Sequence, residues 1–370
     1  MFAKFYSPPT GTSGVNWSGL MKYVTNKIKS YGYTAKFLGS GDFTMVLHFI
    51  PEIISAVNIN DIIYYDGDWL IIKGIKYDET VGITLTGNDL NGVLSQRIAP
   101  PDQISGTSTA GCISHYLNNN IILPNAQNDA DIARRIPLVF PAGGIAGNND
   151  DSFKNNNYEN LADIIRTLCE WADIGYRITG GETAGKLTFR LVKGTDRSIE
   201  QNAIPRVIFS SGWGNVIQQS FEHDVSNMYN AVYGYDSGSS VVRIGYRYKT
   251  ARVIPAGLLR QEAVVDVTLE DGETVDNIPG YALAATEDNV ESHSYNVVPT
   301  VDGFGKDYFL GDKVTVRDRY TNVNYSAVIS EVEKNYSGGQ KNIKVSVGKP
   351  NQKLLNMIIN NTVAGVQKKR

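Results

Sequence analysis

The stretch of residues 82–98, GITLTGNDLNGVLSQRI, constrains the fold of this chain more than any other segment. Ile83 and Leu85 alternate with threonines, which is the two-residue period of a half-buried strand. Gly87 is expected to end this strand, and Asn88 is a suitable N-cap for a helix that follows it. The stretch therefore predicts a strand that turns directly into a short helix.

The helix expected after this strand is amphipathic. Asp89 suits its positive N-terminal end, and Arg97 lies in its last turn, where a cation is favourable. Leu90, Val93 and Leu94 fall on one helical face. We expect Leu90 and Leu94 to pack against the domain that the strand completes, so that the helix orients the following domain. No residue of this segment is expected to be catalytic.

Composition places the chain among ordinary globular proteins of two or three domains. It has 370 residues, of which 42% are hydrophobic and 20% charged. Many short runs of Val, Ile, Thr and Tyr predict a mainly β fold. The net charge of −3 argues against a dedicated nucleic-acid binder, which normally carries a basic face. No secretory signal and no apolar run long enough to span a membrane is found, so we expect a soluble chain made in the cytosol.

Changes in the pattern of apolar, polar and glycine residues along the chain predict an α+β insertion between two β domains. The predicted parts are a first β domain at 1–104, an inserted α+β domain at 105–205, a second β domain at 206–350 with a short helical excursion, and a helical tail at 351–370. The Asp-Gly turn at 66–67 predicts a hairpin in the first domain.

Four predictions concern local structure in the insertion. Residues 158–172 carry the clearest helical pattern, with Asn157 as its cap. Residues 111–123 are expected to run from helix into strand, and residues 141–157 to form a loop. Gly180-Gly181 is expected to be the turn of a hairpin.

Two segments of the outer domains resemble each other. One runs from Asp61 to Gly87 and the other from Asp312 to Gly348. Each has an Asp at a turn, then three strands, and then a glycine where the last strand ends. Two unrelated β-meanders can also agree to this extent. If the repeat is real, the chain carries two similar β domains on either side of a dissimilar insertion.

A search for chemistry finds no set of catalytic residues. The histidines at 48, 115, 223 and 293 lack metal-ligand spacing, although His115 is three residues from Cys112. Paired carboxylates lie in polar stretches, where solvated turns are expected. No phosphate-binding loop or dinucleotide fingerprint is present. The sequence thus predicts no enzyme, no cofactor and no metal site. Cys112 and Cys169 are able to pair, but a buried free thiol is the better interpretation of Cys169.

The order of several motifs is similar to that of the tail hub, or baseplate hub, proteins of long-tailed (siphophage-type) phages. The matching segments are 41–47, 59–75, 86–97 and 310–316, together with the glycine-ended strand at Gly348. The motif positions are Gly41, Asp42, Asp61, Gly87, Asp89, Leu90, Leu94, Arg97, Gly311, Asp312 and Gly348.

The resemblance implies a structural virion protein. In that family the chain forms a homotrimer with two tube-like β-barrel domains per chain, which flank the insertion and build a pseudo-sixfold ring. The ring adapts the sixfold tail tube to a threefold tip. The implied partners are a distal tail or tail tube protein, a tape-measure protein and a spike or fibre protein. DNA would pass through the lumen without specific binding. The implied location is the virion tail tip, after assembly in the host cell cytoplasm.

Two alternatives remain at this stage. One is a carbohydrate-binding or carbohydrate-degrading β-protein, which the aromatic content and the carboxylates favour. The other is the equivalent hub of a contractile injection particle.

Overall fold

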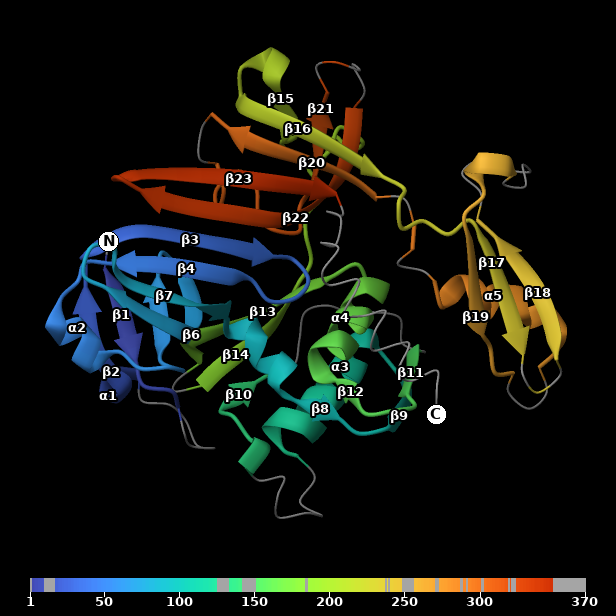
Figure 1. Cartoon of the computed structure of the whole chain (residues 1–370), viewed down its shortest axis with the longest axis horizontal. Helices are drawn as coiled ribbons and strands as arrows, with labels where there is room; N and C mark the ends of the chain where they lie inside the picture. Colours follow the sequence, from blue (N-terminus) through green and yellow to red (C-terminus); the bar gives the residue numbers. More distant parts are fainter. Residues whose placement is uncertain are drawn as a thin grey trace. The chain divides into compact units, whose positions relative to one another are not determined.

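The computed structural model describes residues 2–9, 17–124, 133–141, 151–183, 186–236, 238, 240–247, 256–269, 273–286, 289–290, 292–300, 303–318, 320 and 324–348 (Figure 1). These residues form two compact units. Unit 1 comprises Met1–Gln219 and Asn296–Gly348, and unit 2 contains Ser220–Tyr295. Strands dominate and pair in large antiparallel sheets, which confirms the prediction of a mainly β fold.

The largest sheet has thirteen strands. Its main path runs β16-β20-β23-β22-β3-β4-β7-β6-β5-β1-β2, and β15 and β21 branch from it, with β21 paired to β22. The bounds are β1 (Ala3–Tyr6), β2 (Met21–Thr25), β3 (Ile28–Lys36), β4 (Asp42–Leu47), β5 (Ile62–Tyr65), β6 (Asp68–Asp78), β7 (Gly82–Asp89), β15 (Ile208–Ser210), β16 (Val216–Asp224), β20 (Ser292–Pro299), β21 (Lys313–Arg317), β22 (Asn324–Ser337) and β23 (Gln340–Gly348).

Alternating apolar residues bury one face of the N-terminal strands, as the two-residue period of a strand requires. The core on this face consists of Ala3, Phe5, Tyr31, Tyr33, Ala35, Phe43, Met45, Leu47, Ile53, Val57, Ile63, Tyr65, Leu70, Ile72, Ile83 and Leu85. The predicted hairpin is present between β5 and β6. Asp66 and Gly67 at its turn both have positive φ, of 50° and 84°, as a tight two-residue turn demands.

No closed barrel is formed by the strand pairing of the described residues. The main path of the sheet is open, with β16 and β2 as its ends. Part of the outer edge of β22 is taken by β3 (Figure 1) and therefore is not available to close the second half on itself. The two tube-like barrels expected from the sequence are thus not formed by the pairing within one chain.

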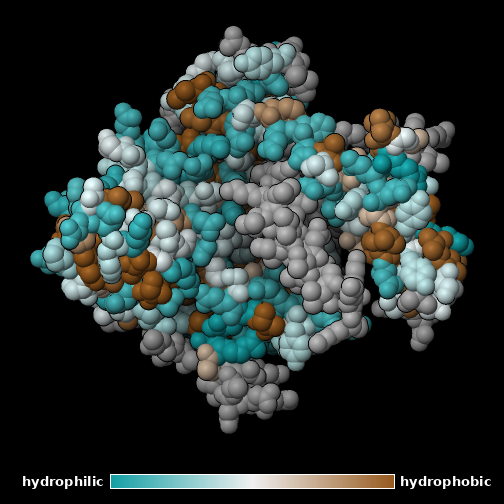
Figure 2. All heavy atoms as spheres, viewed as in Figure 1, coloured by the Kyte–Doolittle hydropathy of each residue, from teal (hydrophilic) through white to brown (hydrophobic). Residues whose placement is uncertain are grey.

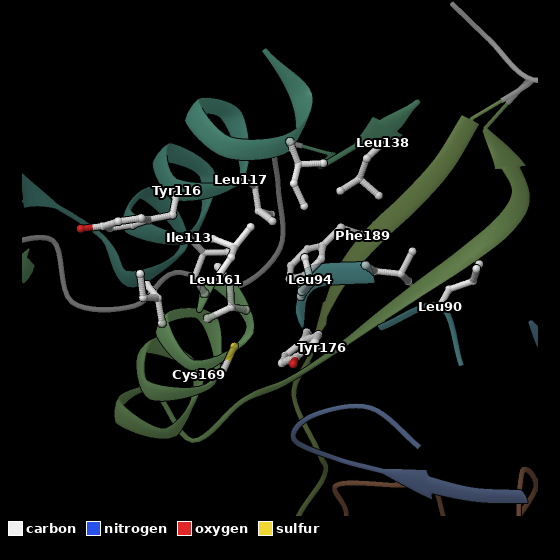
Figure 3. Close-up of a cluster of buried hydrophobic side chains, with 14 of the residues drawn as sticks. Leu90, Leu94, Ile113, Tyr116, Leu117, Leu138, Leu161, Cys169, Tyr176 and Phe189 are labelled. Carbon is white, nitrogen blue, oxygen red and sulfur yellow. The ribbon is translucent and has the colours of Figure 1, made fainter. Parts of the chain in front are cut away.

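Helices and short strands of residues 90–192, which include the end of the predicted first domain and most of the predicted insertion, build a second core. Its elements are η1 (Leu90–Gln96), β8 (Ile98–Ala99), β9 (Asp102–Thr107), α3 (Thr109–Leu117), η2 (Asn118–Ile122), β10 (Leu138–Val139), β11 (Asp151–Asn155), β12 (Glu159–Asn160), α4 (Leu161–Trp171), β13 (Gly175–Thr183) and β14 (Lys186–Val192). Figure 3 shows the side chains of several of these elements converging, with Phe189 of β14 near Leu94 of η1.

The helix predicted at 158–172 is confirmed as α4, but its cap is Asn160 and not Asn157. The Asn160 side chain accepts a hydrogen bond from the Ala162 amide. The strand expected near residue 123 is wrong, because α3 continues as a π-helical turn, η2. Part of the expected loop is also a strand, since β11 pairs with β9.

The expected turn at Gly180-Gly181 is wrong as well. The two glycines lie within β13, which pairs with β14 up to Thr183 and Lys186. A Cβ atom on Gly180 would lie 2.9 Å from the ring of Trp69. The absence of a side chain is required there by packing and not by a turn.

Unit 2 is a small α/β arrangement. Its three-stranded sheet contains β17 (Ala231–Asp236), β18 (Val241–Tyr246) and β19 (Glu262–Asp266), with β17 in the middle. Helix α5 (Ile278–Ala284) has Pro279 in its first turn and contributes Ile278 and Ala282 to the core. A Cβ on Gly234 would lie 2.4 Å from Ile278, so the helix packs close to the strand.

The remaining short elements are α1 (Trp17–Leu20), α2 (Pro51–Ala56), η4 (Ser211–Trp213), η5 (Gly257–Leu259) and η6 (Val275–Asn277). Hydrophobic residues on the face drawn in Figure 2 lie in separate small groups among hydrophilic ones. In the part of the chain that the structure describes, no helix is long and apolar enough to cross a membrane. The tail predicted at 351–370 lies outside the described residues.

Candidate functional site

The repeat suggested by the sequence is present as two meanders of three antiparallel strands. The first meander is β5-β6-β7 and the second is β21-β22-β23. Each begins at a buried aspartate, Asp61 or Asp312, of which 2% and 3% is exposed. The two segments therefore share strand order, direction and starting residue.

The turns before the two meanders have the same hydrogen bonds. Asp61 donates its amide to the Asn58 carbonyl, and its carboxylate accepts the Asn58 amide at 2.8 Å. Asp312 makes the same two contacts with Phe309, the second at 3.0 Å. The residue before each Asp has positive φ, 69° at Asn60 and 93° at Gly311. Equivalent backbone geometry at two such unusual positions is strong support for a true internal repeat.

Each of these carboxylates is also paired with a cation. Lys22 Nζ lies 2.7 Å from Asp61 Oδ2, and Arg197 Nε lies 2.9 Å from Asp312 Oδ2. Asp312 additionally accepts the amide of Thr195 at 2.8 Å. The two carboxylates are buried but satisfied by partly exposed cations and by amides, which is the condition under which a buried carboxylate is tolerated.

A matching irregularity fixes the register of the repeat. The pairing of β6 with β7 shifts between Ile72 and Gly74, and that of β22 with β23 shifts between Ile329 and Glu331. Ile72 faces Gly87, whereas Ile329 faces Val347. The structural equivalent of Gly87 is thus Val347, and the correspondence of Gly87 with Gly348 expected from the sequence is wrong by one residue. A bulge at the same place in both copies is typical of a conserved structural feature and not of an accidental irregularity.

The second meander is joined to the first through β3 and β4. The second half of β22 pairs antiparallel with β3, from Glu331 opposite Lys36 to Ser337 opposite Ser30. Lys334 of β22 is 8% exposed, and its Nζ lies 2.7 Å from Asp68 Oδ2, at the start of β6. Arg177 of β13 binds the other oxygen of Asp68, also at 2.7 Å. One carboxylate, 1% exposed, thereby connects the first meander, the second meander and the insertion.

Asp89 organises the exit from the first meander. Strand β7 continues through Gly87 to Asp89, and Asp89 rather than Asn88 caps the next helix, which is a 3-10 helix. Its carboxylate accepts hydrogen bonds from Tyr33 Oη and Ser40 Oγ, both at 2.9 Å, and from two backbone amides at 3.1 Å, those of residues 41 and 91. Burial raises the pKa of Asp89, and it raises the pKa of Tyr33 well above its usual value.

Asn91 ties this exit to the insertion. Its amide nitrogen donates to the Gly39 carbonyl at 2.9 Å, and its oxygen accepts the Ile178 amide at 2.7 Å. Asn91 is 3% exposed, so these bonds are shielded from water. No pattern in the sequence indicates this role, since an asparagine in the first turn of a helix is ordinary on a helix surface.

Leu90 and Leu94 are fully buried, but not in the core of the first meander. Both belong to the cluster of the insertion, where Figure 3 shows them on the side of Tyr176 and Phe189. The expectation that they pack against their own β domain therefore describes only part of their surroundings, since they also pack against the insertion. The outer sides of the N-terminal strands still reach this cluster through Tyr6, Ile62 and Ile71. The Arg97 carbonyl accepts the amide of Leu161, the first residue of α4.

The remaining motif positions lie at two places. Gly41 and Asp42 are beside the Asp89 exit, where Asp42 Oδ1 accepts Asn88 Nδ2 at 2.7 Å and a Cβ on Gly41 would meet the Thr34 carbonyl at 2.0 Å. Gly311 lies against Phe37, whose ring would be 2.3 Å from a Cβ there. Gly348 ends β23 with φ of 95°.

The clearest titratable pair outside these contacts was not predicted. His115 Nε2 lies 2.7 Å from Asp102 Oδ2, and the Asn119 amide lies 3.1 Å from the same ring nitrogen. Burial and then Asp102 raise the pKa of the nearby Tyr116 to about 12. Within the described ranges no group of three metal-ligating side chains occurs. The packing of α3 beside β9 brings His115 and Asp102 together, and the spacing of these residues in the sequence does not reveal this contact.

The two cysteines are free and buried. Burial strongly raises the pKa of the Cys169 thiol. The alternative of a disulfide between Cys112 and Cys169 is thus not realised. Buried, protonated thiols behave as small apolar side chains and are poor nucleophiles.

Comparison with known protein families identifies the chain. The family model of Siphovirus ReqiPepy6 Gp37-like proteins matches residues 24–349. The chain belongs to this family. The predicted kinship with siphovirus tail proteins is confirmed. A search of curated proteins finds no match.

Solved structures of tail proteins have the same fold. The tail protein from Neisseria meningitidis MC58 aligns with a TM-score of 0.56 and 14% identity, covering 94% of this chain and 96% of that one. The prophage MuSo2 43 kDa tail protein from Shewanella oneidensis aligns with a TM-score of 0.55 and 11% identity, covering 94% and 97%. A chain of the Francisella PdpA-VgrG complex aligns at 0.52 and 11% identity, and the alignment covers 94% of this chain and 52% of that one.

Proposed function

We propose that this protein is a homotrimeric hub at the tip of a phage tail. The observation that carries the proposal is the internal repeat, with its equivalent aspartate turns, bulges and strand order. Three copies of a chain with two equivalent wall segments supply six such segments, which suits contact with a sixfold tube on one side. A unit that appears only once per chain, such as the insertion, is repeated three times and suits a threefold partner.

In this proposal the two tube-like hub domains are residues 1–104 and 206–350, and residues 105–205 are inserted between them. The barrel wall is completed by neighbouring copies and not by one chain. The partners are a distal tail or tail tube protein, a tape-measure protein and a spike or fibre protein. The role is structural and not enzymatic, and the location is the virion tail tip, after assembly in the host cell cytoplasm.

The lumen of the ring would form part of the DNA conduit. The net charge of −3 supports passage without binding, since clusters of Lys and Arg are what hold phosphate backbones. A conduit that bound DNA specifically would retard ejection.

Light scattering on the purified chain tests the oligomer, and electron microscopy of labelled particles tests the location. We expect three times the mass of the chain, and label at the tail tip. Label elsewhere on the particle, or cleavage of a polysaccharide by a monomer, would contradict the hub. A contractile sheath around the labelled particle would instead assign the protein to a contractile injection hub.

A further inference from the structure

The internal repeat extends to the neighbours of each meander in the sheet. The first half runs β3-β4-β7-β6-β5, and the second runs β16-β20-β23-β22-β21. Aligned on the shared bulge, β6 corresponds to β22 and β3 corresponds to β16. Strands β3 and β16 are both nine residues long. In the order of the sheet, the outer strands β3 and β16 therefore occupy equivalent places, and so do the long strands β6 and β22.

We call a joint the pairing of the long strand of one half with the outer strand of the other half. Two such joints are possible, and one of them is made within the chain. Residues 331–337 of β22 pair with residues 30–36 of β3, which is the central strand of the second half against the outer strand of the first. The shared bulge equates Gly74 with Glu331 and Tyr77 with Lys334. Residues 74–78 of β6 are thus the counterpart of the β22 segment that makes the joint.

The second possible joint would pair β6 with β16, and these two strands are not neighbours in the sheet formed by the described residues. Among the described residues, β5 covers β6 only at 68–71, and residues 74–78 pair with β7 alone. Tyr77 in this segment is 48% exposed. Strand β16, the counterpart of β3, is an end of the sheet, and its Ile217 is 71% exposed. Open edges with exposed apolar residues are sites where another strand adds.

We infer that residues 74–78 of β6 in one copy pair antiparallel with β16 of a second copy of this chain, in the manner of β22 and β3. The inference rests on the proposed homotrimer and names its interface. In a ring of three, the three joints within chains alternate with three joints between chains. The contact is heterologous and closes, because every copy offers β6 to one neighbour and β16 to the other.

The competing arrangement uses the two ends of the sheet. Strand β2 is the other end, and its Met21 and Val24 are 47% and 41% exposed. Pairing of β16 with β2 of a neighbour would also satisfy both edges. It has no counterpart within the chain, however, whereas the joint of β16 with β6 copies one that already exists. The repeat therefore favours β6 as the partner of β16.

Disulfide trapping in the full-length chain distinguishes these arrangements. Lys334, the counterpart of Tyr77, lies opposite Tyr33 of β3, and the equivalent place in β16 is Phe221. Tyr77→Cys is therefore combined in turn with Ser220→Cys, Phe221→Cys or Glu222→Cys, because opposed residues of antiparallel strands lie at disulfide distance. The matched control combines Val24→Cys with Phe221→Cys. Cys112 and Cys169 are buried and do not compete. After mild oxidation, we expect covalent dimers and trimers with at least one of the Tyr77 pairs, and single chains with the Val24 pair and with each single variant.

The mass of each variant before oxidation tests whether the chain is a trimer, separately from the test of which strands meet in it. A trimer that cross-links through Val24 and not through Tyr77, or through neither, overturns the β6–β16 joint and leaves the hub standing. A chain that stays monomeric at every concentration and never cross-links overturns both.

Discussion

Lys334 donates a hydrogen bond of 2.7 Å to Asp68, although the two residues are 266 positions apart in the chain. Arg177 reaches the same carboxylate from the insertion. The contact holds together three segments that the sequence separates widely, and it lies beside the pairing of β22 with β3.

Removing one partner of this contact should be costly. We expect Lys334→Met to lower the free energy of unfolding by about 3 kcal/mol, because a carboxylate that is 1% exposed loses a cation. Urea titration measures this change. The control is Lys344→Met on β23, whose ion pair with Glu333 at 3.8 Å is exposed and should contribute about 0–1 kcal/mol. Equal losses in the two variants would show that the buried contact has no special role.

The two repeat turns should be stabilised by the same interaction. We expect Asp61→Ala and Asp312→Ala each to lower the free energy of unfolding by about 1–3 kcal/mol, since each leaves a backbone amide unpaired and removes the partner of a partly exposed cation. Asp312→Ala should cost more, because Asp312 also accepts the Thr195 amide. Asp42→Ala is the control, with a carboxylate that is 73% exposed. A neutral effect of either buried substitution would refute the equivalence of the turns.

The core of the insertion should depend on Leu90 and Leu94. Leu94→Ala should cost about 2–5 kcal/mol, because it leaves a cavity among fully buried side chains. The half-buried Val93→Ala should cost less. Replacing both Leu90 and Leu94 with Asp should abolish folding of the insertion or assembly of the trimer, as measured by limited proteolysis and light scattering. Wild-type assembly of that double variant would contradict the packing described above.

Asp89 should make stability depend on pH. Its folded-state pKa is raised by burial, so the folded protein holds the proton more tightly than the unfolded chain. Its contribution to stability is complete below the unfolded pKa of about 3.9 and falls as the pH rises through the raised folded pKa. Compared with Asp89→Asn, the wild type should therefore lose relative stability as the pH rises from about 4. A difference between the two proteins that is constant with pH would contradict the raised pKa.

The thiols should be inert in the folded protein. Cys112 and Cys169 are buried, and burial raises the pKa of Cys169. We expect no reaction with a thiol reagent near neutral pH and reaction of both thiols after denaturation in urea. Rapid labelling of the native chain would show that the insertion opens.

Local patterns in the sequence predicted local structure well. The alternation of Ile83 and Leu85 with threonines predicted β7, and the Asp-Gly pair predicted the turn before β6. Errors arose where a residue type has two uses. Gly180 was interpreted as a turn residue, whereas Trp69 packs against it. Asn88 and Asp89 are both good caps, and the bonds of Asp89 to Tyr33 and Ser40 decide between them.

Contacts between distant segments were not predictable in this way. Asn91 and Arg177 carry ordinary polar side chains, and their roles depend on which strand lies opposite. Strand β16 shows no alternation, since most of its residues are exposed. Among the described residues β16 is an end of the sheet, so no neighbouring strand on its outer side imposes a pattern on it.

The pairing of β22 with β3 is intramolecular, and this has a kinetic and thermodynamic consequence. The chain connection gives these strands an effective concentration that dilution does not change, whereas a joint between copies weakens as the protein is diluted. Amide hydrogen exchange should then divide the sheet into two classes. The amides of β22 stay protected at every protein concentration, while the outward amides of residues 74–78 gain protection only as copies associate. In the proposed ring, each chain would therefore make its β22–β3 joint first, and the β6–β16 joints would form only when copies meet.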